Sequence, residues 1–197
     1  MNHNEILDRL VEDGNGYLLT SQVVSNGINK TALAAYVKNR KMERVGHGLY
    51  LAQDEWPDEL FQISVLNQRA VFSHETALYL HGLMEREPTV ISVTVPAGYN
   101  ATHLRKQGLR VYQVKPDAAE LGIVMAVTGL GNEVRTFDME RTICDLISCK
   151  EETDVQVFRY AMKEYMASKH KNLGNLMLYA KRFQMEAVVR LYTEVML

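Results

Sequence analysis

The first 55 residues combine helical and strand-like spacings of apolar positions. An apolar stripe at helical spacing predicts a first helix over residues 2–12, and the turn-forming DGNG of residues 13–16 ends it. The stripe consists of Ile6, Leu7, Leu10 and Val11. Residues 17–19 are apolar and short, which predicts an extended segment that pairs with a later strand.

A helix-turn-helix pattern comes next. Thr20 or Ser21 is expected to cap a short helix, because its hydroxyl can accept a hydrogen bond from the first turn. Val23 and Val24 are expected to be the buried residues of this helix. Asn26-Gly27 then supplies a sharp turn, since glycine reaches positive φ without a steric penalty.

The second helix of this pattern is predicted over residues 30–41, with Asn29 as its N-cap. At about 100° per residue, Leu33 and Val37 share the face that must point to the core. The opposite face is small and polar with one long cation. It consists of Thr31, Ala35, Lys38 and Asn39. Small residues allow close approach to a DNA groove, and asparagine can read adenine.

Two short strands are predicted over residues 42–45 and 49–51, joined by the turn Gly46-His47-Gly48. Helix, turn, helix and ribbon in this order predict a winged helix-turn-helix, which usually places its second helix in the major groove. We therefore predict a DNA contact through the second helix, the residues flanking it and the ribbon. The predicted DNA-binding residues are Lys30, Thr31, Ala35, Lys38, Asn39, Lys41, Arg44 and His47. Arg40 falls nearer the core side of the helix and is not among them.

The rest of the chain has a different pattern. Pro57 interrupts the chain and Asp58 is placed to cap a helix over 59–67, so we expect a winged-helix domain at 1–55 and a second domain at 56–197. The second domain is expected to combine a small sheet with a helical C-terminal tail, which makes the fold class α+β. The expected strands are 90–95, 109–114, 123–127 and 133–137. The expected helices are 139–148, with Asp138 as its N-cap, 155–168, 173–183 and 186–196.

The charge distribution supports the DNA-binding prediction more than the net charge of −2 does. Residues 28–53 carry five basic residues and one acid, whereas 54–153 carry nine basic and fifteen acidic residues. A local positive patch can bind phosphates because salt screens charges that lie farther away than about 10 Å. A second basic region lies near the C-terminus and is a further candidate contact with nucleic acid. It consists of Lys163, Lys169, Lys171, Lys181 and Arg182.

Candidate catalytic and metal-binding motifs are incomplete. His74-Glu75 begins like the zinc motif H-E-x-x-H, but Leu78 stands where the second histidine is required. Gln113-Val114-Lys115 resembles half of a nuclease metal site, yet the preceding strand carries no acid. Cys144 and Cys149 are expected to be reduced thiols. We therefore predict no catalytic residue, no metal and no cofactor, and neither a membrane span nor a signal peptide, which together suggest a cytoplasmic protein.

Three later segments, in this order after the winged helix, carry a family resemblance. They are SHETALYLHGL at 73–83, VPAGY at 95–99 and TFDMERTICDLI at 136–147. With them the chain resembles the AbiEi antitoxins of the type IV toxin–antitoxin systems that act in abortive phage infection. The resemblance implies a repressor whose winged helix binds inverted repeats upstream of its own operon. It also implies that the C-terminal domain counteracts a nucleotidyltransferase-like toxin without forming a stable complex with it.

Two other functions stay open at this point. The winged helix could bind another protein, or the chain could be a metal-dependent nuclease, although it lacks the carboxylates expected of one. The sequence leaves the operator, the choice between monomer and dimer, and the antitoxin residues undetermined.

Overall fold

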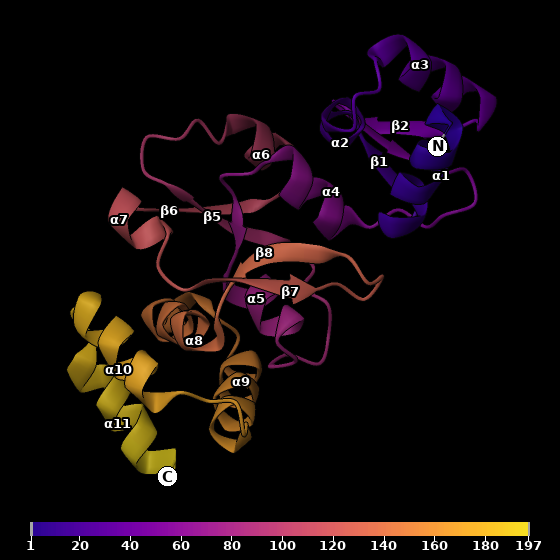
Figure 1. Ribbon diagram of the computed structural model, residues 1–197. Helices are drawn as coiled ribbons and strands as arrows, with labels where there is room; N and C mark the ends of the chain where they lie inside the picture. Colours follow the sequence, from indigo (N-terminus) through magenta and orange to yellow (C-terminus); the bar gives the residue numbers. More distant parts are fainter. Residues whose placement is uncertain (1, 197) are drawn as a thin grey trace. The chain divides into compact units, whose positions relative to one another are not determined.

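The computed structural model describes residues 2–196 of the chain (Figure 1). Contacts between Cα atoms divide it into two compact units. The N-terminal unit is Met1–Gln68 together with Val127–Val134, and the C-terminal unit is Arg69–Ala126 together with Arg135–Leu197. Together they form an α+β protein with two small sheets. None of the helices among the described residues has the length and apolar character needed to cross a bilayer.

The N-terminal unit places helices around a three-stranded antiparallel sheet. Its elements are α1 (His3–Asp13), β1 (Tyr17–Leu19), α2 (Thr20–Ser25), α3 (Lys30–Asn39), β2 (Glu43–Gly46), β3 (Leu49–Leu51) and α4 (Glu59–Leu66). The strand order is β1-β3-β2, so β1 pairs with the ribbon as the sequence predicts. Leu7, Val23, Ile28 and Leu33 form a buried core between the helices.

The short helix α2 differs from the expectation in two ways. Leu19 occupies its N-cap position, and no side chain caps the helix, so neither Thr20 nor Ser21 has the expected role. Val23 is fully buried, but Val24 is 48% exposed. The reason is geometric: neighbouring residues of a helix point about 100° apart, so a six-residue helix with one buried face covers only one of the two valines.

The N-terminal unit continues past the expected boundary at residue 55 to Gln68. Pro57 and Asp58 do begin α4 as expected, and the Asp58 carboxylate caps it by accepting a hydrogen bond from the Phe61 backbone N–H. However, Phe61 packs on Tyr17 with ring centroids 4.7 Å apart, and Phe61 and Val65 cover the buried side chains of β1 and β3. Apolar packing thus makes α4 a part of this unit.

The C-terminal unit contains a five-stranded sheet of order β6-β5-β4-β8-β7. The strands are β4 (Val71–Phe72), β5 (Ser92–Pro96), β6 (Arg110–Val114), β7 (Ile123–Val127) and β8 (Glu133–Phe137). The pairs β5–β6 and β4–β8 are parallel, whereas β4–β5 is antiparallel. The residues 127–134 at the tip of the β7–β8 hairpin are grouped with the N-terminal unit.

The helices of the C-terminal unit are α5 (His74–Leu80), α6 (Thr102–Lys106), α7 (Pro116–Ala119), α8 (Met139–Ser148), α9 (Val155–Ala167), α10 (Leu173–Arg182) and α11 (Glu186–Met196), with a 3₁₀ turn at Lys150–Glu152. Helix α8 is the central one, because Ile143, Leu146 and Ile147 belong to the same core as residues from α9, α10 and α11. The short helices α6 and α7 are absent from the sequence expectation, since four or five residues are too few to show a helical period.

Candidate nucleic-acid interface

Helix α3 buries one face and exposes the other. Asn29 caps it as predicted, accepting a hydrogen bond from the Ala32 N–H at 2.8 Å. Leu33 and Tyr36 are buried, and Val37 is half-buried. The exposed residues are Lys30, Thr31, Ala34, Ala35, Lys38 and Asn39. The five helix residues predicted to contact DNA therefore all lie on the solvent side of α3.

The cations of this face are not neutralised by acids of the protein. Among the described residues, no ion pair involves Lys30, Lys38 or Lys41. Lys41 follows the helix at φ +51°, a conformation that few non-glycine residues adopt. This left-handed step turns the chain from α3 into β2. Because these lysines form no ion pair within the described part of the chain, no such pair has to break before they bind a phosphate.

The turn of the ribbon holds the last two predicted residues together. The Arg44 Nε donates to the Gly46 carbonyl at 3.2 Å, and the Arg44 Nη2 lies 3.4 Å from the His47 Nδ1. Both side chains are exposed. Gly48 has φ +70°, which allows the tight return into β3. The ribbon thus offers a cation and an imidazole side by side at its tip.

Arg40 has a structural role instead. Its Nη2 lies 2.7 and 2.8 Å from the two carboxylate oxygens of Asp8 on α1. The Tyr36 hydroxyl donates to the same carboxylate at 2.6 Å, and the Arg40 guanidinium lies over the Tyr36 ring. Burial and the neighbouring Asp8 charge raise the pKa of Tyr36 to about 12. This cluster ties α3 to α1 and so fixes the direction of the exposed face.

A buried polar cluster that sequence reasoning missed joins the hairpin tip to the rest of the N-terminal unit. The Asp58 carboxylate accepts hydrogen bonds from the Thr128 hydroxyl and, at 2.8 Å, from the Asn132 Nδ2. The Tyr17 hydroxyl accepts a hydrogen bond from the Asp58 backbone N–H at 2.7 Å. Asp58 and its hairpin partners lie about 70 residues apart, so no local pattern could reveal them.

The second basic region is partly neutralised. Arg182 forms an ion pair with Asp117, and the Lys163 Nζ lies 4.0 Å from a carboxylate oxygen of Glu164. The Lys171 ammonium donates to the Ser168 carbonyl at 3.2 Å. Lys169 and Lys181 are exposed. The region is therefore a weaker candidate for a phosphate contact than the face of α3.

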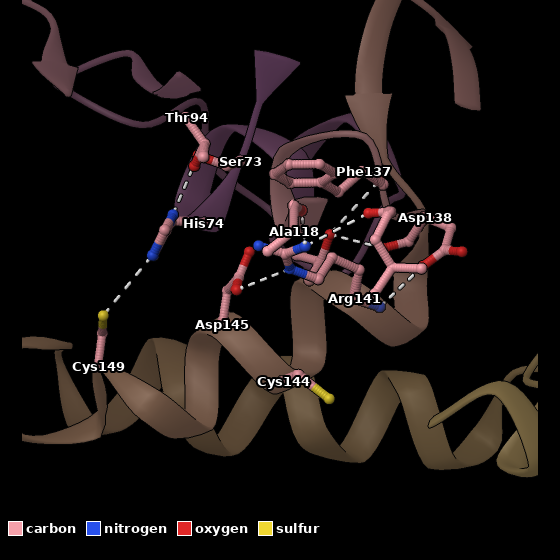
Figure 2. A network of polar contacts seen from close by, with 12 residues as sticks. Ser73, His74, Thr94, Ala118, Phe137, Asp138, Arg141, Cys144, Asp145 and Cys149 are labelled. Atoms are coloured by element: carbon pink, nitrogen blue, oxygen red, sulfur yellow. Dashed lines mark hydrogen bonds and ion pairs between the residues drawn. The ribbon is translucent and has the colours of Figure 1, made fainter. Parts of the chain in front are cut away.

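A network of polar contacts in the C-terminal unit surrounds Arg141 on α8 (Figure 2). The Arg141 side chain is 1% exposed and is sandwiched between Phe137 and Phe183, with each ring centroid 4.4 Å from the guanidinium carbon. Its Nε donates to the Asp145 Oδ1 at 3.0 Å, and its Nη1 donates to the carbonyls of Ala118 and Leu121. Burial raises the pKa of Asp145 to about 6, although the Arg141 charge opposes this shift.

The histidines and cysteines of this unit are internal. His81 donates from Nε2 to the Phe137 carbonyl at 2.6 Å. His74 stacks on Tyr112 and lies between the Ser73 hydroxyl and the Cys149 thiol, 3.0 and 3.6 Å away (Figure 2). Burial, with help from nearby arginines, lowers the pKa of His74 to about 3, whereas burial raises the pKa of Cys149. The pair is therefore neutral near pH 7.

Both thiols are free, and Cys144 is buried. Burial raises the pKa of Cys144 to about 12, which makes it a poor nucleophile. Within residues 2–196, no group of three or more His, Cys, Asp or Glu side chains is arranged to hold a metal ion. Lys115, of the nuclease-like tripeptide, lies exposed at the start of α7.

Comparison with known proteins identifies the fold alone. No family model and no curated protein matches the sequence. A solved structure, the Rv2827c protein from Mycobacterium tuberculosis, superimposes with a TM-score of 0.59 over 95% of this chain and 75% of its own. The two chains are 9% identical, so the likeness concerns the arrangement of elements and leaves function to the site itself.

Proposed function

We propose that this protein is a DNA-binding transcriptional repressor whose N-terminal unit is a winged helix-turn-helix. In this proposal α3 enters the major groove, Asn39 and Thr31 contact base edges, and Lys30, Lys38 and Lys41 contact phosphates. The ribbon residues Arg44 and His47 contact the adjacent backbone. The target is double-stranded operator DNA with inverted repeats in the cytoplasm of a bacterium.

One observation carries the proposal: the exposed face of α3 combines small residues with cations that have no ion-pair partner among the described residues. A helix face that only meets water is usually rich in paired Glu and Lys. Two exposed alanines, Ala34 and Ala35, add neither solubility nor core packing. They permit a close approach to a groove, and Arg40 with Asp8 holds the helix rigid for it.

The test is fluorescence anisotropy with a labelled duplex from upstream of the gene. We expect Lys38→Ala to weaken binding by roughly 1 kcal/mol for all sequences and to reduce the salt slope by about one. Asn39→Ala is expected to relax the base preference at one position by about 1–3 kcal/mol. Arg9→Ala, which removes an exposed cation from α1, is the charge-matched control and should change little.

A protein-interaction module is the competing function for the same face. Binding to DNA through several phosphates must weaken steeply between 50 and 200 mM salt, because counterions are released. A salt-independent affinity, or equal effects of Lys38→Ala and Arg9→Ala, would reject DNA recognition through α3.

We further propose, on the resemblance to the AbiEi antitoxins, that the C-terminal unit counteracts a nucleotidyltransferase-like toxin without a stable complex. Co-expression with such a toxin from a neighbouring gene tests this with the full chain. The double variant Lys38→Ala/Asn39→Ala should lose repression of a reporter and still rescue growth. Loss of rescue by this variant would show that the two activities cannot be assigned to separate units.

A further inference from the structure

The C-terminal unit contains a cavity that the proposed function does not use. Its volume is about 620 Å³, which is within the range of about 300–1,000 Å³ that small-molecule sites occupy. The end of β6, α7, α8 and the residues from the end of α10 to the start of α11 line it. Helices α8 and α10 lie side by side (Figure 1), and the Arg141 Nη1 on α8 donates to the Ala118 carbonyl on α7.

Arg141 contributes its guanidinium group to the cavity wall, and contacts within the protein hold this group in a fixed position. The two phenyl rings and the three hydrogen bonds from Nε and Nη1 hold its plane in place. Arginine has five N–H donors, and the hydrogen bonds of the Arg141 side chain to the described residues come from Nε and Nη1. A ligand oxygen that accepts from Nη2 would add a charge-assisted hydrogen bond to those that the guanidinium already makes.

The cavity lining contains three basic and two acidic side chains, so one basic side chain has no acidic partner in the lining. Asp145 pairs with Arg141, and Asp117 pairs with Arg182. Lys115, at the mouth where β6 meets α7, has no ion-pair partner among residues 2–196. The second carboxylate oxygen of Asp145 is buried and lacks a hydrogen-bond partner there as well. The lining thus leaves one positive charge without an ion-pair partner, whereas the Asp145 oxygen can be met only by a hydrogen-bond donor of a ligand, such as a hydroxyl or amino group.

Much of the remaining lining is apolar, although Ser148 and Gln184 also belong to it. The larger apolar side chains are Ile147, Phe183, Met185 and Val188, and the Phe183 ring also stacks on Arg141. A ligand therefore needs an anionic group for the cations and an apolar or flat body for the apolar part of the lining. The two cations come from different elements, α8 and the start of α7, and so approach from different directions. A tetrahedral phosphate presents oxygens in several directions, whereas a carboxylate presents two in one plane.

We propose that this cavity binds a small organic phosphate, with its phosphate group on Lys115 and the Arg141 Nη2 and its body against Phe183, Met185 and Val188. The site is separate from α3, and the proposal does not depend on DNA recognition. A mononucleotide is a suitable probe because it combines a phosphate with a flat ring.

Isothermal titration calorimetry with AMP, glycerol 3-phosphate and inorganic phosphate tests the site in the full-length protein. We expect AMP to bind with 1:1 stoichiometry and more tightly than inorganic phosphate, because only AMP reaches the apolar wall. Lys115→Ala is expected to weaken AMP about tenfold, which is the loss of one charge-assisted hydrogen bond. Lys106→Ala on α6 removes an exposed cation outside the cavity lining and is expected to leave the affinity unchanged.

A second variant tests the cavity without changing its charge. Val188, on α11, is 47% exposed and lines the cavity, so Val188→Trp should fill it and abolish binding while the protein stays folded. The proposal is overturned if none of the three probes saturates below about 10 mM. It is also overturned if Lys115→Ala and Lys106→Ala weaken AMP equally, since that result indicates a diffuse electrostatic attraction.

Discussion

The two units use the same chemical pair, arginine with aspartate, in opposite environments. On the N-terminal unit the Arg40–Asp8 pair lies at the surface, with side chains 57% and 46% exposed. In the C-terminal unit the Arg141–Asp145 pair is enclosed, with side chains 1% and 14% exposed. A surface pair is worth little, because water and salt screen it, whereas removing one partner of a buried pair leaves an uncompensated charge. The environment of a charge, and not its residue type, decides its role.

The same contrast separates the candidate functions of the two units. The N-terminal unit presents cations that no acid neutralises among the described residues, at the surface of a helix with small side chains. Such a face is suited to a large polyanion. The C-terminal unit places its central cation inside, beside a cavity of about 620 Å³. Such a site is suited to a small ligand, since only a small molecule can reach the guanidinium.

The largest predicted effect concerns the buried pair. Arg141→Met should lower the free energy of unfolding by about 3–5 kcal/mol, because Asp145 and two backbone carbonyls lose their donors. Arg40→Met is the matched control and should cost at most about 1 kcal/mol. Urea unfolding followed by circular dichroism measures both. Equal costs for the two variants would show that burial does not distinguish the pairs.

His74 is predicted to make stability depend on pH. Its folded-state pKa of about 3 lies below the ordinary value of 6.5, so its contribution to stability is present above pH 6.5 and is lost as pH falls toward 3. The advantage of the wild type over His74→Asn should therefore shrink by about 1.4 kcal/mol per pH unit below pH 6.5. Urea unfolding of both proteins from pH 7.5 to 4.5 measures this difference. A difference that stays constant with pH would contradict the buried neutral histidine.

Asp145 makes the stability of the wild type depend on pH in the direction opposite to His74. Its folded-state pKa of about 6 lies above the ordinary 3.8, so stability is gained as pH falls from 6 toward 4. We expect the two groups largely to cancel between pH 6 and 4 in the wild type. The His74→Asn variant should therefore gain stability on acidification from pH 6 to 4, whereas the stability of the wild type should change little.

A smaller effect should separate the two cations at the C-terminal end of α3. Arg40→Ala is expected to lower the free energy of unfolding by about 0.5–1 kcal/mol, because α3 loses its tie to Asp8 on α1. Lys38→Ala should leave stability within about 0.5 kcal/mol, since its side chain is exposed and unpaired among the described residues. DNA affinity should show the reverse order at low salt. Anisotropy and urea unfolding on the same samples provide both values, and the same order in both would contradict the assignment.

The smallest predicted effect lies at Lys41, whose φ of +51° suits glycine better than lysine. Lys41→Gly should stabilise the protein by roughly 0.5 kcal/mol, because relief of the left-handed strain exceeds the added flexibility of the unfolded chain. The same variant should weaken DNA binding through loss of the cation. Thermal unfolding and anisotropy measure the two effects. A destabilised variant with unchanged affinity would mean that Lys41 serves the fold alone.

Local signals in the sequence were sufficient for many helices and strands. Asn29, Asp58 and Asp138 were expected as N-caps, and each accepts the capping hydrogen bond in the structure. These signals succeed because a cap and an apolar period act within one or two turns of the chain. The expected cap of α2 was wrong, because the tertiary context placed Leu19 there. The DNA contacts predicted on α3 are exposed, and their function stays a prediction.

The sequence by itself determined the order of elements, the amphipathic face of α3 and the segregation of basic and acidic segments, since these depend on neighbouring residues. Only the tertiary structure decided that Arg141 is enclosed by two phenyl rings and that Arg40 pairs with Asp8. It also decided that the hairpin tip belongs with residues 1–68 and that a cavity forms beside α8. These features join residues that lie 4 to 74 positions apart in the sequence. Burial sets the strength of the interactions that each charge makes, and a side chain becomes buried only when the chain has packed.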